Sequence, residues 1–284
     1  MGAHAVLLLS CLDQKGLVAT VSEWVYRHGG NIVGADQHSD VEKGVFLQRV
    51  EWELDGFGLA RDEIADRFRP IAERFGMRWD LCFTDQVTRT AVLVSKLGHC
   101  LFDLLWRQKA AEFPAVVPLV VSNHPDLGPV AESFGARFEC VPVTPATREA
   151  AEGHLLSLLA EERIELVVLA RYMQVVGPRV LDLHPQRIIN IHHSFLPAFV
   201  GARSYHQAYE RGVKAIGATA HYVTAELDQG PIIEQDVARV SHRDSVEDLL
   251  RKGRDLEKVV LARAVDLHVR HGVLVYGNKT VVFD

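Results

Sequence analysis

Two side chains in the second half of the chain have the types that catalysis at a carbonyl group requires. Asn190 and His192 lie two positions apart at the end of the apolar run RIINIHH, and residues two apart on an extended strand project to the same face. The Asn amide offers two N–H donors, and His offers an acid–base group near neutral pH. Together they would polarise a carbonyl group and manage its proton. The alternative is a strand end whose polar residues only satisfy backbone groups of the next loop.

A carboxylate and a third imidazole follow further along the chain. Asp228 lies in LDQGPII, in the loop before another apolar run, although Asp-x-Gly-Pro is also an ordinary turn signal and that interpretation stays open. His221 lies in GATAHYV, where Thr219, His221 and Val223 share one face of a strand. A lone His in such a place is commonly a core residue with its hydrogen bonds satisfied.

Metal and nucleophilic chemistry fit the pattern less well. His192 and His193 are adjacent and face opposite ways on a strand, and no H-x-x-x-H or C-x-x-C companion accompanies them, so we predict no metal site. Ser194 follows the His pair, but the G-x-S-x-G elbow of a serine nucleophile is absent.

The elements that must position these residues alternate between apolar strands and helical segments. The strands are TAVLVS (90–95), VVPLVVS (116–122), RFECVPV (137–143), ELVVLA (165–170) and RIINIHH (187–193). This alternation of strands and helices predicts a Rossmann-like, mostly parallel, doubly wound α/β sheet, in which ligands bind at the carboxyl ends of the strands. Two more strands (215–223 and 231–240), a long helix (244–272) and a terminal hairpin follow.

The first part of the chain has a different order. Residues 4–83 read as strand, helix, strand, strand, helix, strand, with the second helix running from Ala60 to Phe75. This is the βαββαβ order of the ferredoxin-like unit. The polar stretch DQVTRT is the expected linker, which gives a first domain at 1–84, a linker at 85–89 and a second domain at 90–284.

Composition limits the partners that we expect. The 284 residues carry a net charge of −6, with 48% hydrophobic and 24% charged residues, so nucleic acid and anionic membrane are not expected partners. No apolar run approaches the ~20 residues of a membrane span. The four cysteines have no C-x-x-C pairing and are expected to be buried thiols of a cytoplasmic protein. A small-molecule substrate is the default expectation.

Residues 189–235, INIHHSFLPAFVGARSYHQAYERGVKAIGATAHYVTAELDQGPIIEQ, resemble the folate-dependent formyltransferase family, with Asp228 placed 38 positions after Asn190. The resemblance extends over most of residues 88–284. It implies that Asn190, His192 and Asp228 form a catalytic trio that His193, His221 and Thr219 support. It also implies a pterin pocket that holds the substrate without any cofactor or metal. The residues that would line this pocket are Met173, Gln174, Val176, Thr224 and Leu227.

In three features the chain resembles the hydrolytic, deformylase branch of this family. That branch releases formate from 10-formyltetrahydrofolate and so supplies formate for purine biosynthesis. The stretch VSKLGHCLFDLL lacks the Gly-rich phosphate loop of the glycinamide ribonucleotide transferases. HHSFLP has Phe195 where those transferases have Leu. Residues 4–83 resemble an ACT domain.

Formyl transfer to an amine remains the alternative. A methionyl-tRNA formyltransferase, which expects a basic RNA-binding domain, and a non-enzymatic amino-acid sensor fit less well.

The ACT resemblance implies an effector site and an assembly. Glycine or methionine would bind near Asp13, Gly16, Leu17, Asn31 and Ile32, and the chain would form a homo-oligomer. A purely structural role in holding subunits together is equally open. Val200 and Arg203 depart from the residues usual in the family, which leaves the substrate contacts of that loop open.

Overall fold

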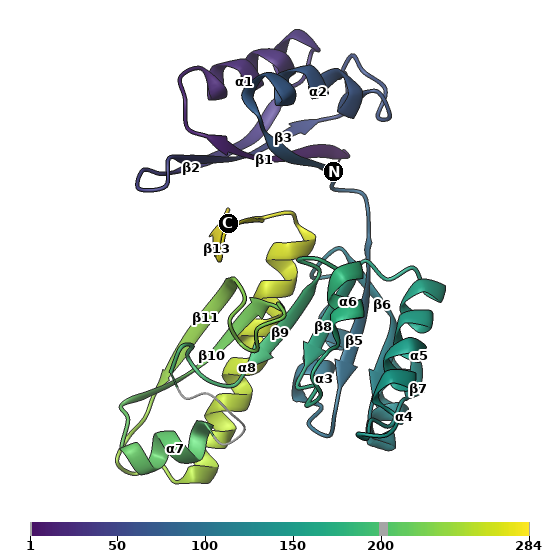
Figure 1. Ribbon diagram of the computed structural model, residues 1–284, viewed down its shortest axis with the longest axis vertical. Helices are drawn as coiled ribbons and strands as arrows, with labels where there is room; N and C mark the ends of the chain where they lie inside the picture. The colour runs from purple at the N-terminus through teal and green to yellow at the C-terminus, as the bar shows by residue number, and fades with distance from the viewer. Residues whose placement is uncertain (1, 199–203, 284) are drawn as a thin grey trace. The chain divides into compact units, whose positions relative to one another are not determined.

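The computed structural model describes residues 2–198 and 204–283 and divides the chain into two units. The first unit runs up to Val87 and takes in the chain from Arg270 onward, and the second runs from Thr88 to Val269. Figure 1 shows a helix-covered sheet in each unit. The α/β fold class predicted from the sequence is confirmed, with a ferredoxin-like unit followed by a mostly parallel sheet.

The first unit contains the predicted βαββαβ order. Its elements are β1 (His4–Leu12), α1 (Leu17–Arg27), β2 (Ile32–Asp40), β3 (Val45–Glu53), α2 (Ile64–Phe75) and β4 (Arg78–Phe83). The strands form an antiparallel sheet in the order β2-β3-β1-β4, and both helices lie on one face of it (Figure 1).

An aromatic cluster fills the space between this sheet and its helices. Trp24 of α1 contacts the rings of Trp52, Phe57 and Phe68 at centroid distances of 5.3–6.2 Å. Strand β3 alternates from Val50 to Glu53 as a sheet with one covered face requires, whereas the central strand β1 is apolar and buried from Ala5 to Leu9. Helix α2 begins at Ile64 rather than at Ala60, because residues 61–63 form a turn in which Glu63 accepts a hydrogen bond from the Ala60 N–H.

The terminal hairpin of β12 (Val273–Tyr276) and β13 (Lys279–Val282) groups with the first unit. Arg49 of β3 donates to the His271 carbonyl at 3.0 Å, and the Tyr276 hydroxyl donates to Asp40 at 3.2 Å. The sequence pattern instead predicts this hairpin within a second domain of residues 90–284. The difference arises because these polar contacts join chain segments more than 200 residues apart, which local patterns do not reveal.

The second unit is built on a seven-stranded sheet in the order β11-β10-β9-β8-β5-β6-β7. Its strands are β5 (Thr88–Val94), β6 (Ala115–Ser122), β7 (Arg137–Cys140), β8 (Leu166–Ala170), β9 (Ile188–His192), β10 (Ala215–Tyr222) and β11 (Ile232–Arg239). Strands β5 to β9 are parallel, whereas β10 runs antiparallel to both β9 and β11. The chain reverses its winding direction between β5 and β8, which is a topological switch point.

Helices cover both faces of this sheet (Figure 1). They are α3 (His99–Lys109), α4 (Gly128–Ser133), α5 (Arg148–Glu161), α6 (Pro178–Leu183), α7 (Ser204–Arg211) and α8 (Val246–Val269), and a short 3₁₀ turn η1 (Pro125–Leu127) precedes α4. Ala91 and Leu93 of β5 pack toward α5, while the intervening Val92 lies among residues of α3 and α8. This alternation explains why the second half of β5, residues 91–94, is apolar on both faces.

Three further expectations need correction. Thr88 and Arg89, expected in the linker, pair with β6, and Arg89 is bound by Glu165 and Glu162. Strand β7 is shorter than RFECVPV and ends before Pro142, which has no N–H to donate. The four cysteines are not all buried, since Cys140 is exposed and Cys82 is half-buried.

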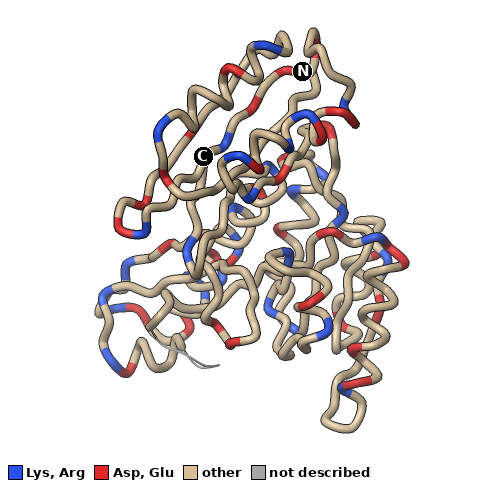
Figure 2. The backbone as a smooth tube through the Cα atoms, turned by 45° about the horizontal axis from the view of Figure 1, so that its top comes forward, with Lys and Arg blue, Asp and Glu red and all other residues tan. Residues whose placement is uncertain are grey.

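Charged residues of both signs are interspersed along the described chain (Figure 2). Among the described helices, none has the length and apolar composition needed to span a bilayer.

Candidate active site

A row of three side chains crosses the carboxyl end of the sheet in the second unit. Asn190 of β9 is paired with Leu169 of the parallel neighbour β8 and with His221 of the antiparallel neighbour β10. Residues in register on adjacent strands project to the same face. The buried isoleucines of β9 (Ile188, Ile189 and Ile191) fix this strand in the core, so that Asn190 is presented from a rigid element.

Asp228 reaches this row from the loop that follows β10. The loop is held at both ends, because the Tyr222 N–H donates to the Pro231 carbonyl at 2.9 Å and the Val223 N–H donates to the Ile188 carbonyl at 2.8 Å. Gly230 lies so close to the Tyr222 carbonyl that a Cβ atom would collide with it. Asp228 has φ +56°, a left-handed conformation that Asp tolerates better than most residues. The turn therefore directs the Asp228 carboxylate back over β9 and β10.

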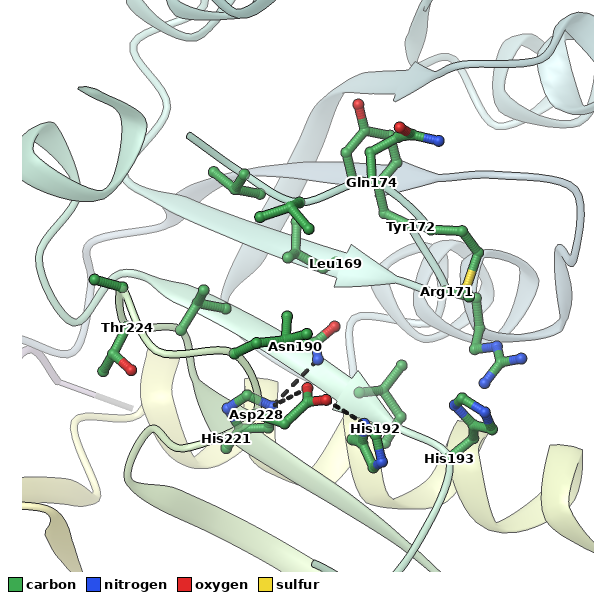
Figure 3. Close-up of a pocket in the computed structure, with 17 residues that line it drawn as sticks. Leu169, Arg171, Tyr172, Gln174, Asn190, His192, His193, His221, Thr224 and Asp228 are labelled. Carbon is green, nitrogen blue, oxygen red and sulfur yellow. Dashed lines mark hydrogen bonds and ion pairs between the residues drawn. The ribbon is translucent and has the colours of Figure 1, made fainter. Parts of the chain in front are cut away.

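His221 forms hydrogen bonds that fix the amide of Asn190. Its Nδ1 lies 2.9 Å from the Tyr222 carbonyl oxygen, so Nδ1 carries the proton. Its Nε2 lies 3.2 Å from Asn190 Nδ2 and accepts one N–H of the amide. The second amide N–H of Asn190 is then available to the pocket (Figure 3). His221 is only 2% exposed, so this arrangement is held rigidly.

The Asp228 carboxylate lies between two imidazoles. Its Oδ2 is 3.2 Å from His192 Nδ1, and its Oδ1 is 3.7 Å from His221 Nε2 (Figure 3). The hydrogen bond with His192 is the largest cause that lowers the pKa of Asp228 well below its usual range, against the opposing effect of burial. The other ring nitrogen of His192, Nε2, is buried and has no hydrogen-bond partner among the described residues. Asp228 thus orients His192 so that Nε2 remains available to a substrate.

These polar groups gather at one end of a cavity of about 260 Å³. The remaining walls are mainly apolar and come from the segment after β8 and the loop after β10. Every residue predicted from the sequence to contact substrate lines this cavity, namely Met173, Gln174, Val176, Thr224 and Leu227. The Met173 N–H donates to Ser95 Oγ at 3.0 Å, which anchors one wall to the end of β5.

The three supporting residues take different positions. His193 lines the cavity beside His192, with ring centroids 5.2 Å apart. The two rings do not face opposite ways as expected, because β9 ends at His192 and the strand alternation stops there. Thr219 is fully buried and does not line the cavity. Its hydroxyl donates to the Ser194 carbonyl and accepts from the Leu196 N–H, so Thr219 holds the segment that follows β9.

The residues proposed for an effector site are distributed around the start of α1. Leu17 belongs to the core and is 2% exposed, and Asn31 donates to Glu53 at 2.8 Å. Gly16 precedes α1 with φ +93°, and the Asp13 N–H donates to the Gly44 carbonyl. Ile32 opens β2 at a register shift. None of these five residues lines the cavity described above. Val200 and Arg203 lie outside the described residues.

A polar end of this kind can stabilise negative charge on a carbonyl oxygen through Asn190 and His192, while Asp228 accepts a proton. Comparison with known proteins shows which chains this one is similar to. The formyl transferase family model matches residues 88–265. The formyltetrahydrofolate deformylase of Synechocystis sp. is 56% identical over 279 residues, covering 98% of each chain. The chain belongs to the formyltetrahydrofolate deformylase family.

Solved structures separate this family from its relatives. The crystal structure of a formyltetrahydrofolate deformylase from Pseudomonas syringae has a TM-score of 0.98 at 46% identity and covers 100% of this chain and 95% of that chain. A glycinamide ribonucleotide transformylase from Symbiobacterium toebii has a TM-score of 0.67 at 34% identity and covers 72% of this chain and 98% of that chain. The deformylases therefore share both units, whereas the transformylase resembles only part of the chain.

Sequence reasoning missed a buried polar cluster in this deformylase-family chain. Glu257 of α8 is 1% exposed and accepts hydrogen bonds from His99 Nε2 at 2.7 Å and from the Tyr205 hydroxyl at 2.8 Å. Arg171 Nε lies 3.5 Å from the same carboxylate. One signal was present in the sequence, because Glu257 interrupts the buried stripe of α8 between Gly253 and Val260.

His99, Cys100 and Glu257 have the donor atoms of a metal site, all within 4.8 Å of one another. The chemistry of the cluster opposes this role. The Arg171 guanidinium would repel a cation, and burial raises the pKa of the Cys100 thiol well above its ordinary value, which keeps it protonated. The hydrogen bond from His99 and the charge of Arg171 outweigh burial and lower the pKa of Glu257. The group is best described as an ion-paired hydrogen-bond cluster.

Proposed function

We propose that this protein hydrolyses 10-formyltetrahydrofolate to formate and tetrahydrofolate, with water as the formyl acceptor. The observation that carries the proposal is the convergence of Asn190, His192 and Asp228 at the polar end of one cavity. The folate would lie along the apolar walls, with its formyl group at this polar end. No metal or redox cofactor is required, because the folate is the substrate and the residues supply the acid–base chemistry.

In the first step, a water molecule held by Asp228 attacks the formyl carbon. The new C–O bond forms while the carbonyl π electrons move to oxygen, and Asp228, ionised because of its lowered pKa, accepts the proton that water loses. The amide N–H of Asn190 and an N–H at Nε2 of protonated His192 stabilise the oxyanion. Loss of one such donor typically costs about 10²–10³ in rate.

In the second step, the tetrahedral intermediate collapses. The bond between the formyl carbon and N10 breaks, and N10 takes a proton delivered from the His192–Asp228 pair through water, which leaves tetrahydrofolate and formate. Proton transfer between these two residues is supported by their 3.2 Å separation. His221 acts as a positioning residue in both steps, since it holds the Asn190 amide.

Purified protein tests this proposal without any amine acceptor. Formate release should be readily measured for the wild type and should fall by about 10² or more in N190A and H192A, since each removes one oxyanion donor. D228N should lose most activity because an amide cannot accept the proton. Formyl transfer that occurs only after glycinamide ribonucleotide is added would instead establish the transferase alternative.

The first unit is the proposed regulatory part of the enzyme. A hydrolase of this kind would drain formylated folate if it were always active. The ferredoxin-like strand order of this unit supports the proposal that it serves as an ACT-like regulatory unit. Glycine or methionine is the proposed effector, in a cytoplasmic homo-oligomer that supplies formate for purine synthesis. Turnover measured with and without each amino acid tests this, and identical rates would refute it.

A further inference from the structure

The cluster around Glu257 reaches the cavity of the candidate site through one of its members. Its members come from four separate elements: His99 begins α3, Arg171 follows β8, Tyr205 lies in α7 and Glu257 lies in α8. Of these four, Arg171 lines the cavity. Figure 3 shows its guanidinium beside His193, at the end of the cavity where His192 lies. The Arg171 side chain therefore connects the catalytic end to the buried carboxylate.

The ion pair with Glu257 holds Arg171 in this place, and its Nε and Nη1 are buried without a hydrogen-bond partner among the described residues. Its side chain is 11% exposed and its partner Glu257 is 1% exposed, so their attraction is little screened by solvent. The Arg171 backbone has φ +63°, which is uncommon for a residue other than glycine and is maintained only where surrounding contacts determine it. His99 and Tyr205 hold Glu257 from its other sides. Glu257 thereby keeps the Arg171 guanidinium at this end of the cavity.

The position of this guanidinium bears on which nucleophile can react. The apolar part of the cavity is needed for the folate, and Asn190, His221 and Asp228 occupy one side of its polar end. The space near His192 is then left for an attacking group, and His193 and Arg171 lie at this end of the cavity (Figure 3). Water needs no room beyond its own oxygen, whereas an amine needs room for its substituent.

The fold alone does not choose between these nucleophiles, because a transformylase shares the architecture over 72% of this chain. We propose that Arg171, held against Glu257, closes the acceptor end of the cavity and so restricts the formyl acceptor to water. This inference rests on the proposed hydrolysis, and it assigns Arg171 as a specificity residue rather than as a catalytic residue.

Removing the wall should admit an amine. In R171A, the nitrogen of added glycinamide would attack the formyl carbon, the bond to N10 would break, and N10 would take the proton that the amine loses. The products are N-formylglycinamide and tetrahydrofolate. R171M is the matched control, because Met has a side chain of similar reach without the charge and should keep the wall closed.

The experiment measures formate and N-formylglycinamide in the same reaction, at a fixed high concentration of glycinamide. We expect the ratio of N-formylglycinamide to formate to rise at least tenfold in R171A and to stay at the wild-type value in R171M. A folded R171A that hydrolyses with the wild-type ratio would overturn the inference. Equal rises in R171A and R171M would also overturn it, since charge rather than bulk would then exclude the amine.

Two further measurements keep the inference testable if R171A does not fold. R171A/E257Q removes both charges of the buried pair and avoids an uncompensated carboxylate. This double variant should show the same rise in the ratio of N-formylglycinamide to formate. The wild type can be given hydroxylamine and glycinamide, and formyl transfer should favour hydroxylamine by more than its solution reactivity accounts for. If the wild type instead transfers the formyl group to hydroxylamine and glycinamide in the ratio of their solution reactivities, the proposed role of Arg171 is refuted. Wild type that releases no formate would refute the proposed function instead, so the two failures are distinguishable.

Discussion

His221 offers a sharp test of how the site is organised, because its role depends on geometry and not on direct chemistry. H221F keeps a ring of similar size but removes Nε2, which accepts from Asn190 at 3.2 Å, and Nδ1, which donates to the Tyr222 carbonyl at 2.9 Å. The Asn190 amide would then rotate away from the position that serves the oxyanion.

The expected size of this effect follows from what the amide contributes. Complete loss of an oxyanion donor costs about 10²–10³ in rate, and a misdirected donor retains part of its effect. We therefore expect kcat to fall by about 10–10², which corresponds to roughly 1.4–2.7 kcal/mol of transition-state stabilisation. KM should change by less than about threefold, because the apolar walls that would hold the folate are untouched.

The assay is steady-state formate release over a range of substrate concentrations. Y222F is a suitable control, because Tyr222 is next to His221 on β10, is buried and does not line the cavity. Its hydroxyl forms a hydrogen bond of 2.8 Å with His268 Nδ1. Y222F should lose a hydrogen bond of similar strength and keep its kcat. A kcat of H221F within twofold of the wild type, or a loss confined to KM, would contradict the role of His221.

Three other predictions concern pH, packing and thiol reactivity. The hydrogen bonds that lower the pKa of Asp228 stabilise the fold above its unfolded-state pKa of ~3.9, and this contribution is lost as the pH falls through the lower folded-state pKa. D228N should therefore lower Tm by about 2–4 °C at pH 7. The difference in Tm between the wild type and D228N should become smaller below about pH 4, and an unchanged difference at low pH would contradict a stabilising role for ionised Asp228. Phe68 is 1% exposed and contacts Trp24 and Trp79; in denaturant unfolding F68A should lose about 3–5 kcal/mol, and a loss below 1 kcal/mol would be inconsistent with a packed core. Cys140 is exposed whereas Cys100 is buried with a raised pKa, so an aromatic disulfide reagent should modify Cys140 first, and C140S should remove the fast phase.

Local patterns were sufficient for the parts of this protein that depend on neighbouring residues. The two-residue period of a strand placed Asn190 and His192 at the same strand end, and the alternation of apolar strands with helices predicted the parallel sheet. Both arguments use only sequence-local physics. The βαββαβ order of the first unit was accessible for the same reason.

Contacts between distant segments were not accessible in this way. The pairing of Asn190 with His221 depends on the antiparallel register of β10 against β9, which the sequence does not define. The return of Asp228 to His192 depends on a left-handed turn and on the close approach of Gly230 to Tyr222. The family resemblance, rather than periodicity, had indicated that Asp228 belongs with the strand residues.

The cluster around Glu257 shows the same limit more strongly. A charged residue on the buried stripe of α8 signals that a partner exists, but nothing local identifies Arg171, His99 or Tyr205 as its partners. The terminal hairpin is similar, since Arg49 and Asp40 bind it from residues far away in the chain. Such polar contacts follow from the tertiary fold and not from any single element.

The central claim is that Asn190, His192 and Asp228 direct a water molecule onto the formyl carbon. Its most direct test is turnover of 10-formyltetrahydrofolate in ¹⁸O-labelled water without any amine, followed by mass analysis of the formate. The account predicts formate that carries one labelled oxygen for each turnover, formed in equal amount to tetrahydrofolate. Formate without the label, or no formate until an amine acceptor is supplied, would contradict it.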